Sequence, residues 1–190
     1  MAEPSGTEDG MELPKFKYHP DPVSTGSIVE SEAKCVCCGE VRGYVYSVTI
    51  YGDENYDHCI CPWCIADGSA HKKLGITFMN EDAVGGDVDW DRVPESVVEE
   101  ITQRTPAFTG WQPEQWLTHC GDAAQFLGLA GRKELEAFGP DPVAGIKENS
   151  DLEDAEWDDV YAALSKDGSP TAYLFRCSKC GEFGGFWDCD

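Results

Sequence analysis

Positive charge is scarce in this sequence. The 190 residues include 14 Lys and Arg against 36 Asp and Glu, which gives a net charge of −22 at pH 7. Such a chain repels nucleic acid and anionic membrane surfaces at long range, so neither is an expected partner. The charge favours a basic protein as partner, although an acidic surface also serves solubility without any partner.

Long hydrophobic runs are missing as well. No stretch approaches 18 consecutive apolar residues, so we expect no membrane span. The opening MAEPSGTEDGMELP lacks the basic and apolar regions of a secretory signal, and residues 1–12 predict a disordered acidic tail. These absences predict a cytoplasmic protein, whose ten cysteines meet a reducing environment.

The motifs of common catalytic sites are also lacking. The sequence has no Gly-rich phosphate loop, no GxSxG and no HExxH. No set of Ser, His and Asp is visible by spacing. An enzyme is therefore not the favoured interpretation.

The sequence does contain enough apolar material for a folded core. Hydrophobic residues make up 41% of the chain, including six Trp, eight Phe and seven Tyr. We expect a single domain of the α+β class over residues 13–190. Its predicted parts are a zinc module at about 31–78, a helical region at about 91–165 and a C-terminal β-hairpin at about 170–190.

Periodicity predicts the elements of these parts. Alternating apolar residues favour a β-hairpin over residues 41–60. A helix should follow from Cys64 and end at Gly75. Further helices are expected at about 92–103, 113–120, 122–127, 133–138 and 150–164, and strands at 171–176 and 183–187.

The strongest motif is a double CxxC pattern. Cys35 and Cys38 precede Gly39, whose freedom to adopt positive φ permits the tight turn that aims two thiolates at one ion. Cys61 and Cys64 form the second pair, at the start of the expected helix. A knuckle, a hairpin and a CPxC that opens a helix follow each other in this order in treble-clef zinc fingers. The four cysteines therefore predict one closed, structural zinc site.

Other residues near this motif leave the identity of the ligands partly open. Cys37, Cys59 or His58 could replace a ligand, whereas His71 lies two helical turns beyond Cys64, too far for the same ion. A thioredoxin-like redox pair at the CPxC is a rival interpretation. It needs a parallel βαβ context, and the expected hairpin does not provide one.

A second knuckle consists of Cys177 and Cys180, again followed by a glycine. One pair cannot saturate zinc, so further ligands are needed, and the candidates are His119, Cys120 and Cys189. This cluster is the candidate for a second zinc site.

The second cluster also supports an alternative function, a metal-dependent enzyme that uses His119, Cys120, Cys177 and Cys180. A mixed Cys/His set can leave a coordination position open, as catalytic zinc requires. Asp122 or His19 would then be the acid–base group.

Two acidic segments predict solvated surface. Asp87, Asp89 and Asp91 alternate along the chain but lack the Gly and Glu positions of a calcium loop. The acidic run at 151–159 predicts the wet face of a helix and is the expected contact for a basic partner. Among the aromatic residues, we expect four in the core: Trp111, Trp116, Phe126 and Trp157.

Several longer motifs resemble the CbrC-like family. They are LPKFKYHPDP from Leu13 with the later Thr25-Gly26, CPWCIADGSA from Cys61, WLTHCGD from Trp116, and YLFRC from Tyr173 with Cys180-Gly181. The resemblance covers nearly everything from residue 13 onward. The family is largely uncharacterised, and its namesake is linked to tolerance of a nuclease-type colicin. The resemblance thus implies a tolerance or immunity-type protein that binds a basic partner such as a nuclease toxin, and it supplies no catalytic residues.

Overall fold

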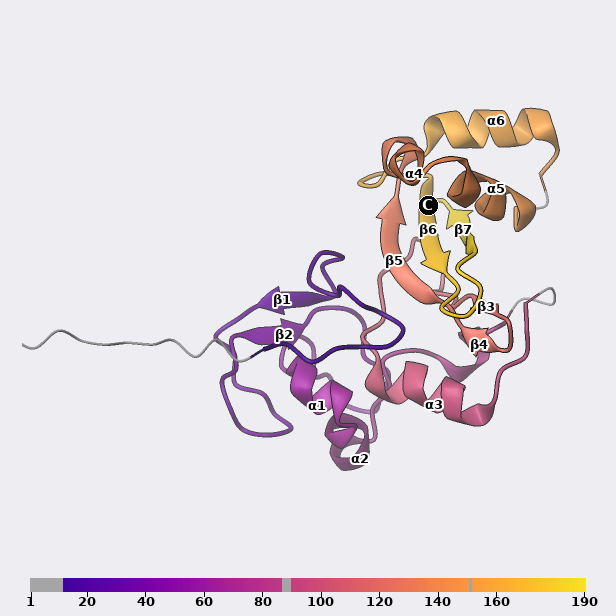
Figure 1. The fold of residues 1–190 in the computed structure, drawn as a ribbon. Helices are drawn as coiled ribbons and strands as arrows, with labels where there is room; N and C mark the ends of the chain where they lie inside the picture. Colours follow the sequence, from indigo (N-terminus) through magenta and orange to yellow (C-terminus); the bar gives the residue numbers. More distant parts are fainter. Residues whose placement is uncertain (1–11, 87–89, 151) are drawn as a thin grey trace, which may run out of the picture.

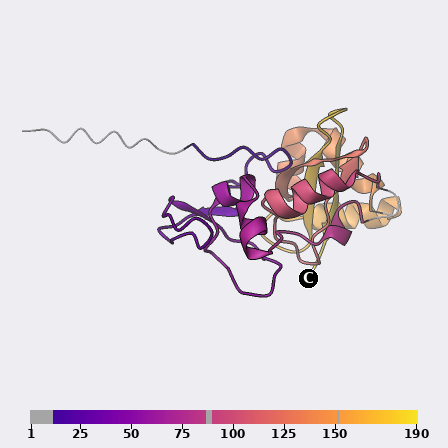
Figure 2. The same ribbon diagram turned by 90° about the horizontal axis from the view of Figure 1, so that it is seen from below.

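The computed structural model describes residues 12–86, 90–150 and 152–190, and these residues adopt an α+β fold, as the sequence predicts. Figure 1 shows an N-terminal lobe in indigo and magenta and a C-terminal lobe in orange and yellow, and Figure 2 shows the same two lobes from below. The predicted tail at 1–12 lies outside the described residues, apart from Glu12. No helix of the described chain is long and apolar enough to span a membrane.

The N-terminal lobe contains a two-stranded sheet in which β1 (Ile28–Glu30) pairs antiparallel with β2 (Tyr44–Tyr46). The expected hairpin over 41–60 is therefore wrong. The chain does return beside β2, where the N–H of Tyr46 donates to the Ile60 carbonyl (2.8 Å). It forms no second strand there, and the neighbouring carbonyl of Cys59 accepts instead from the N–H of Val36, which lies in the turn between Cys35 and Cys38 (3.0 Å).

Two short helices follow, α1 (Pro62–Ala66) and α2 (Ser69–Leu74). The sequence predicts one helix here, but Gly68 adopts a left-handed conformation (φ 73°) and divides it. The end at Gly75 (φ 66°) is as expected, because glycine tolerates the left-handed conformation that closes a helix. Proline occupies the first position of α1, where a backbone N–H would have no hydrogen-bond partner within the helix in any case.

Between the lobes lie the short 3₁₀ helix η1 (Glu81–Ala83) and α3 (Glu95–Arg104). The helix α3 confirms the prediction at 92–103, and its apolar side chains Val97, Val98 and Ile101 pack on the central core. Of the alternating aspartates, two lie outside the described residues (87 and 89). Asp91 is exposed, and its Oδ2 accepts from the N–H of Gly121 (3.0 Å).

Strands replace the helices expected at 113–120 and 122–127, so both of those predictions are wrong. The segment contains β3 (Thr118–His119), β4 (Asp122–Ala123) and β5 (Gln125–Ala130). Cys120 and Gly121 both have positive φ (56° and 66°), the geometry of a two-residue hairpin turn. Burial alternates along β5, which is the strand period of two.

The C-terminal lobe is built on an antiparallel sheet of order β5-β6-β7. The strands β6 (Thr171–Arg176) and β7 (Phe183–Asp188) confirm the predicted hairpin. The helices α4 (Arg132–Phe138) and α6 (Asp154–Ala163) were expected, whereas α5 (Pro140–Glu148), which packs against β7, was not. Figure 1 shows these helices gathered around one end of the sheet.

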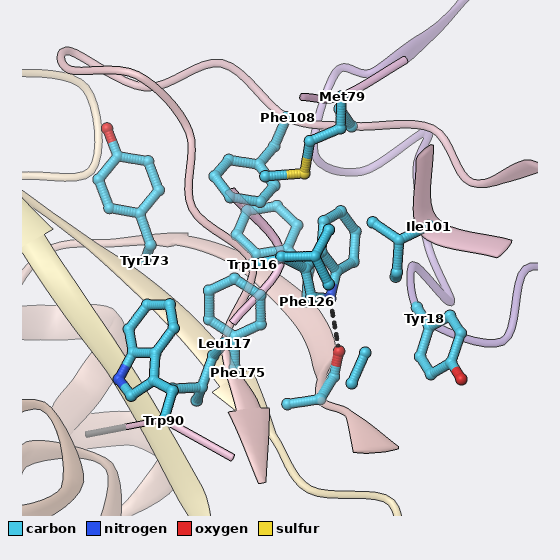
Figure 3. Packing of buried hydrophobic residues seen from close by; sticks show 14 residues of the cluster. Tyr18, Met79, Trp90, Ile101, Phe108, Trp116, Leu117, Phe126, Tyr173 and Phe175 are labelled. Carbon is cyan, nitrogen blue, oxygen red and sulfur yellow. Dashed lines mark hydrogen bonds between the residues drawn. The ribbon is translucent and has the colours of Figure 1, made fainter. Parts of the chain in front are cut away.

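The central core is a cluster of buried residues, rich in aromatic rings, that joins side chains of both lobes (Figure 3). Phe108 and Phe126 stack with ring centroids 4.0 Å apart, and the indole N–H of Trp116 donates to the Ala124 carbonyl (2.9 Å). Each such ring contributes about 1.5–3 kcal/mol by burial. The expected core positions Trp116, Phe126 and Trp157 are buried, but Trp111 is 48% exposed, so that prediction is wrong.

Candidate metal centres

The first cysteine cluster lies in the core of the N-terminal lobe. The Sγ atoms of Cys35, Cys38, Cys61 and Cys64 all lie within 4.8 Å of one another, close enough to hold a metal ion. Gly39 (φ 79°) closes the knuckle by donating its N–H to the Cys35 carbonyl (2.7 Å). The second pair is positioned by α1, which begins directly after Cys61.

The spacing of these thiols suits tetrahedral coordination. The Sγ atoms of Cys35 and Cys64 are 3.9 Å apart, and so are those of Cys38 and Cys61. Four thiolates at about 2.3 Å from one zinc ion are separated by about 3.8 Å along each edge of the tetrahedron. The cluster therefore has the dimensions of a four-thiolate site.

The pKa values of the thiols in the first cluster favour a bound cation. The neighbouring thiol of Cys61 and several backbone N–H groups lower the pKa of Cys35 to about 4, against the effect of burial. The Cys35 thiolate in turn raises the pKa of Cys61, and burial raises that of Cys64 to about 12. The negative charge of one thiolate thus disfavours the ionisation of the neighbouring thiols. A divalent cation at the centre would offset this repulsion and allow all four to ionise.

The other candidate ligands of this lobe point elsewhere. The thiol of Cys37 lies 3.4 Å from Ser69 Oγ, and the thiol of Cys59 donates to the Tyr56 carbonyl (3.0 Å). His71 donates through Nδ1 to the Ile76 carbonyl (2.9 Å), and His58 is exposed. The strand before the CPxC pairs antiparallel with β1, which is not the βαβ context of a thioredoxin-like redox pair.

The second cluster joins two turns from different hairpins. His119 ends β3, Cys120 follows it in the turn, and Cys177 and Cys180 lie in the turn between β6 and β7. Their ligand atoms lie within 4.8 Å of one another, with Cys180 Sγ 3.4 Å from His119 Nδ1. The third candidate, Cys189, is exposed and lies outside the cluster.

The ring of His119 is held by Glu182, a residue that no sequence motif singles out. Its Nε2 lies 3.4 Å from Oε2 of Glu182, while its Nδ1 faces the thiols. A carboxylate that accepts from the distal N–H of a metal-binding histidine fixes the tautomer and the orientation of the ring. The available signal was an acidic residue directly after the CxxCG knuckle.

The thiols of the second cluster differ in acidity. Burial opposes the ionisation of Cys177, but backbone N–H groups and the His119 ring outweigh it and bring its pKa down to about 6. The backbone N–H of Glu182 favours the Cys180 thiolate, yet burial and the neighbouring Cys177 raise that pKa to about 12. The hydrogen bond between Cys177 and His119 raises the pKa of the His119 ring. A cation bound at the second cluster would likewise favour the deprotonated form of its three thiols and of its histidine.

A pocket of about 1000 Å³ opens beside the second cluster, and His119, Cys177 and Cys180 line it. The expected acid–base residues do not. His19 is fully buried and donates through Nδ1 to the Pro106 carbonyl (2.7 Å). Asp122 accepts from the hydroxyl of Tyr18 (2.6 Å) and lies away from the pocket wall.

Comparison with known proteins finds relatives along almost the whole chain. The protein of family UPF0167 from Mycobacterium bovis is 44% identical over 183 residues, which cover 92% of each chain, and that from Mycobacterium tuberculosis gives the same values. The UPF0167 protein of Pseudomonas aeruginosa is 39% identical over 171 residues, covering 90% of this chain and 93% of its own. No solved structure matches.

These comparisons do not test the resemblance to CbrC-like proteins, which stays a prediction together with its link to colicin tolerance. The family model that matches spans residues 13–189, nearly the same residues as the quoted motifs. The chain therefore belongs to the uncharacterised protein family UPF0167.

Proposed function

We propose that this protein is a zinc-stabilised binding protein of the cytoplasm whose partner is a basic protein. One observation carries the first half: each cluster supplies four nitrogen or sulfur ligands. Structural zinc sites have four protein ligands, whereas catalytic zinc keeps a position for water or substrate. Two complete ligand sets therefore support metal ions that hold loops together.

Zinc is the metal that these ligands favour. Four thiolates, or three thiolates and one imidazole, are typical of structural zinc, whereas calcium and magnesium prefer oxygen. The reducing cytoplasm keeps such thiols available. Zinc at both clusters would tie the knuckle to α1 in one lobe and the β3–β4 turn to the β6–β7 turn in the other.

The basic partner is supported by charge. The net charge of −22 favours fast, salt-sensitive association with a positively charged surface. On this protein, exposed carboxylates along α6 and at its start form an acidic face that could meet such a partner. They belong to Glu153, Asp154, Glu156, Asp158 and Asp159. A nuclease toxin, as the CbrC-like resemblance implies, is a basic partner of this kind, and the role would be tolerance or immunity.

The metal count tests the first half of the proposal. Elemental analysis of the purified protein should find two zinc ions per chain, with one lost in Cys177→Ser and one in Cys61→Ser. The thermal unfolding of Cys61→Ser should also lose its cooperative N-terminal transition, since that cluster lies in the core of its lobe. The proposal would be contradicted if the wild-type protein, stripped of zinc, unfolded at the same temperature as the zinc-loaded wild-type protein. Failure to retain any basic protein at low salt would contradict the second half.

The pocket beside the second cluster favours one other candidate, a metal-dependent enzyme. Cys120 is exposed on its turn, and a cluster that releases this thiol would have an open position facing the pocket. A second metal ion that exchanges freely while the fold persists would support this candidate. A second metal ion that leaves only on unfolding would exclude it.

A further inference from the structure

The pocket beside the second cluster has a defined place in the fold. Its walls come from α5, from the start of β7, from β3 and from the knuckle between β6 and β7. Trp90 and Phe183 add aromatic surface. At about 1000 Å³ it lies at the upper end of ligand pockets, which hold about 300–1000 Å³, so it has room for a segment of chain and not for a single ion alone.

The charges on its walls are mostly negative. Among the described residues, four carboxylates line the pocket, from Asp91, Asp141, Glu148 and Glu182, together with the cation Arg176. A zinc ion with three thiolates and one imidazole carries a net charge of about −1, so a loaded second cluster adds negative charge.

Two of these carboxylates are free to meet a ligand. Asp141 and Glu148 stand at the two ends of α5, both exposed, and neither makes an ion pair or a side-chain hydrogen bond within the described chain. The neighbouring lysines are engaged elsewhere. Lys147 pairs with Asp154 (2.5 Å), and Lys179 donates to the Cys120 carbonyl (3.0 Å).

We propose that this pocket receives a short segment of a basic protein partner, bound through its lysine or arginine side chains. The inference rests on the proposed binding function and names its site. The cavity locates the site, and the unpaired carboxylates define the charge of its ligand. One basic group would lie near Asp141 and a second near Glu148, because seven residues of α5 at a rise of 1.5 Å each separate these positions by about 10 Å. The aromatic walls suit an alkyl chain or a cation–π contact.

Calorimetric titration of the zinc-loaded full chain at low salt tests this. The probe is the blocked pentapeptide Gly-Lys-Arg-Lys-Gly, beside a version with Gln at the three basic positions and beside spermidine. We expect the basic peptide to bind and the Gln peptide not to bind. The double variant Asp141→Asn with Glu148→Gln should weaken binding roughly tenfold, the sum of two screened charge contacts.

The acidic face of α6 is the competing site, and Asp158→Asn with Asp159→Asn removes the same charge there. If the pocket is the site, this change should weaken peptide binding less than about twofold. The variant Arg176→Gln gives an opposite sign: it should tighten binding of a cation by roughly threefold and would weaken binding of an anion.

The outcomes separate the two proposals. If both double variants bind the peptide equally, or if α6 alone matters, the pocket is not the site but the binding function stands. If the wild-type protein binds neither the peptide nor any basic protein, both proposals fail. Spermidine that binds as tightly as the peptide and is lost in the same variant would assign the pocket to a free polyamine and overturn the protein partner.

Discussion

Acidification should destabilise the fold through His19, which belongs to neither metal-binding cluster. Its ring is fully buried, edge-on to Phe126 with centroids 5.1 Å apart. Because Nδ1–H donates to the Pro106 carbonyl (2.7 Å), Nε2 is the acceptor, and it lies 2.8 Å from the hydroxyl of Thr25. Burial lowers the pKa of His19 to about 4, against small opposing effects of the Pro106 carbonyl and Asp21.

The sign and the size follow from linkage. The pKa is lower in the folded than in the unfolded state (6.5), so stability is full above pH 6.5 and is lost as the pH falls toward 4. These two values give a loss of about 1.3 kcal/mol between pH 7.5 and pH 5.5, and a limit of about 3 kcal/mol at lower pH.

Urea unfolding of the wild-type protein and of His19→Asn, both with excess zinc at the two pH values, measures this term. Asparagine can still donate to Pro106 but cannot take up the proton. The variant should therefore be less stable at pH 7.5, yet its stability should fall by about 1.3 kcal/mol less on acidification. The exposed His58→Asn is the matched control and should follow the wild type. Parallel pH profiles for wild type and His19→Asn would refute the reasoning.

Three further substitutions test the second cluster and its surroundings. Glu182→Gln should weaken zinc binding at the second cluster about 10-fold to 100-fold in a chelator competition and leave the first unchanged, since the carboxylate orients His119; equal affinities would remove that role. Cys120→Asn should abolish four-ligand coordination, while the stability of the zinc-free protein stays within about 0.5 kcal/mol because Asn-Gly suits the same turn. A zinc-free variant clearly less stable than the zinc-free wild type would contradict this. Gly145→Ala should destabilise by about 1–3 kcal/mol in urea, although alanine normally favours a helix, because its Cβ would lie 2.3 Å from the Phe183 carbonyl oxygen; a more stable variant would show that α5 and β7 can separate.

The elements that the sequence predicts well are those whose local signals agree with their surroundings. The helix α3 has an apolar stripe, and β6 and β7 flank a knuckle that forces a turn. The helix α5 escaped prediction because it contains Pro140, Pro142 and Gly145. Both prolines lie in the first turn, where no N–H is needed, and the glycine permits close contact with β7, which no local pattern reveals.

The segment around β5 shows where local reasoning fails. The residues of β5 mix strand-favouring Phe126 with helix-favouring Leu and Ala, and pairing with β6, in which Phe175 lies opposite Phe126 and 49 residues later, decides the strand. For the candidate site, the two CxxC pairs define their own geometry, so the first cluster needed no tertiary information. The grouping of His119 with Cys177, the pocket and the role of Glu182 all depend on that long-range pairing and could not be predicted in full.

The separation of the ligands along the chain has a consequence for biosynthesis. In the first cluster, Cys35 and Cys64 are 29 residues apart, so the site is complete soon after the first third of the chain is made. In the second cluster, His119 and Cys180 are 61 residues apart. The strand β6, which lies between β5 and β7 in the sheet, must pair with β5 before these ligands can meet. Domains fold from the N-terminus as they emerge, and closing a longer loop is slower. If both clusters bind zinc as proposed, the two ions are acquired in sequence, and a shortage of zinc late in translation would leave a chain with a folded N-terminal lobe and an incomplete C-terminal lobe.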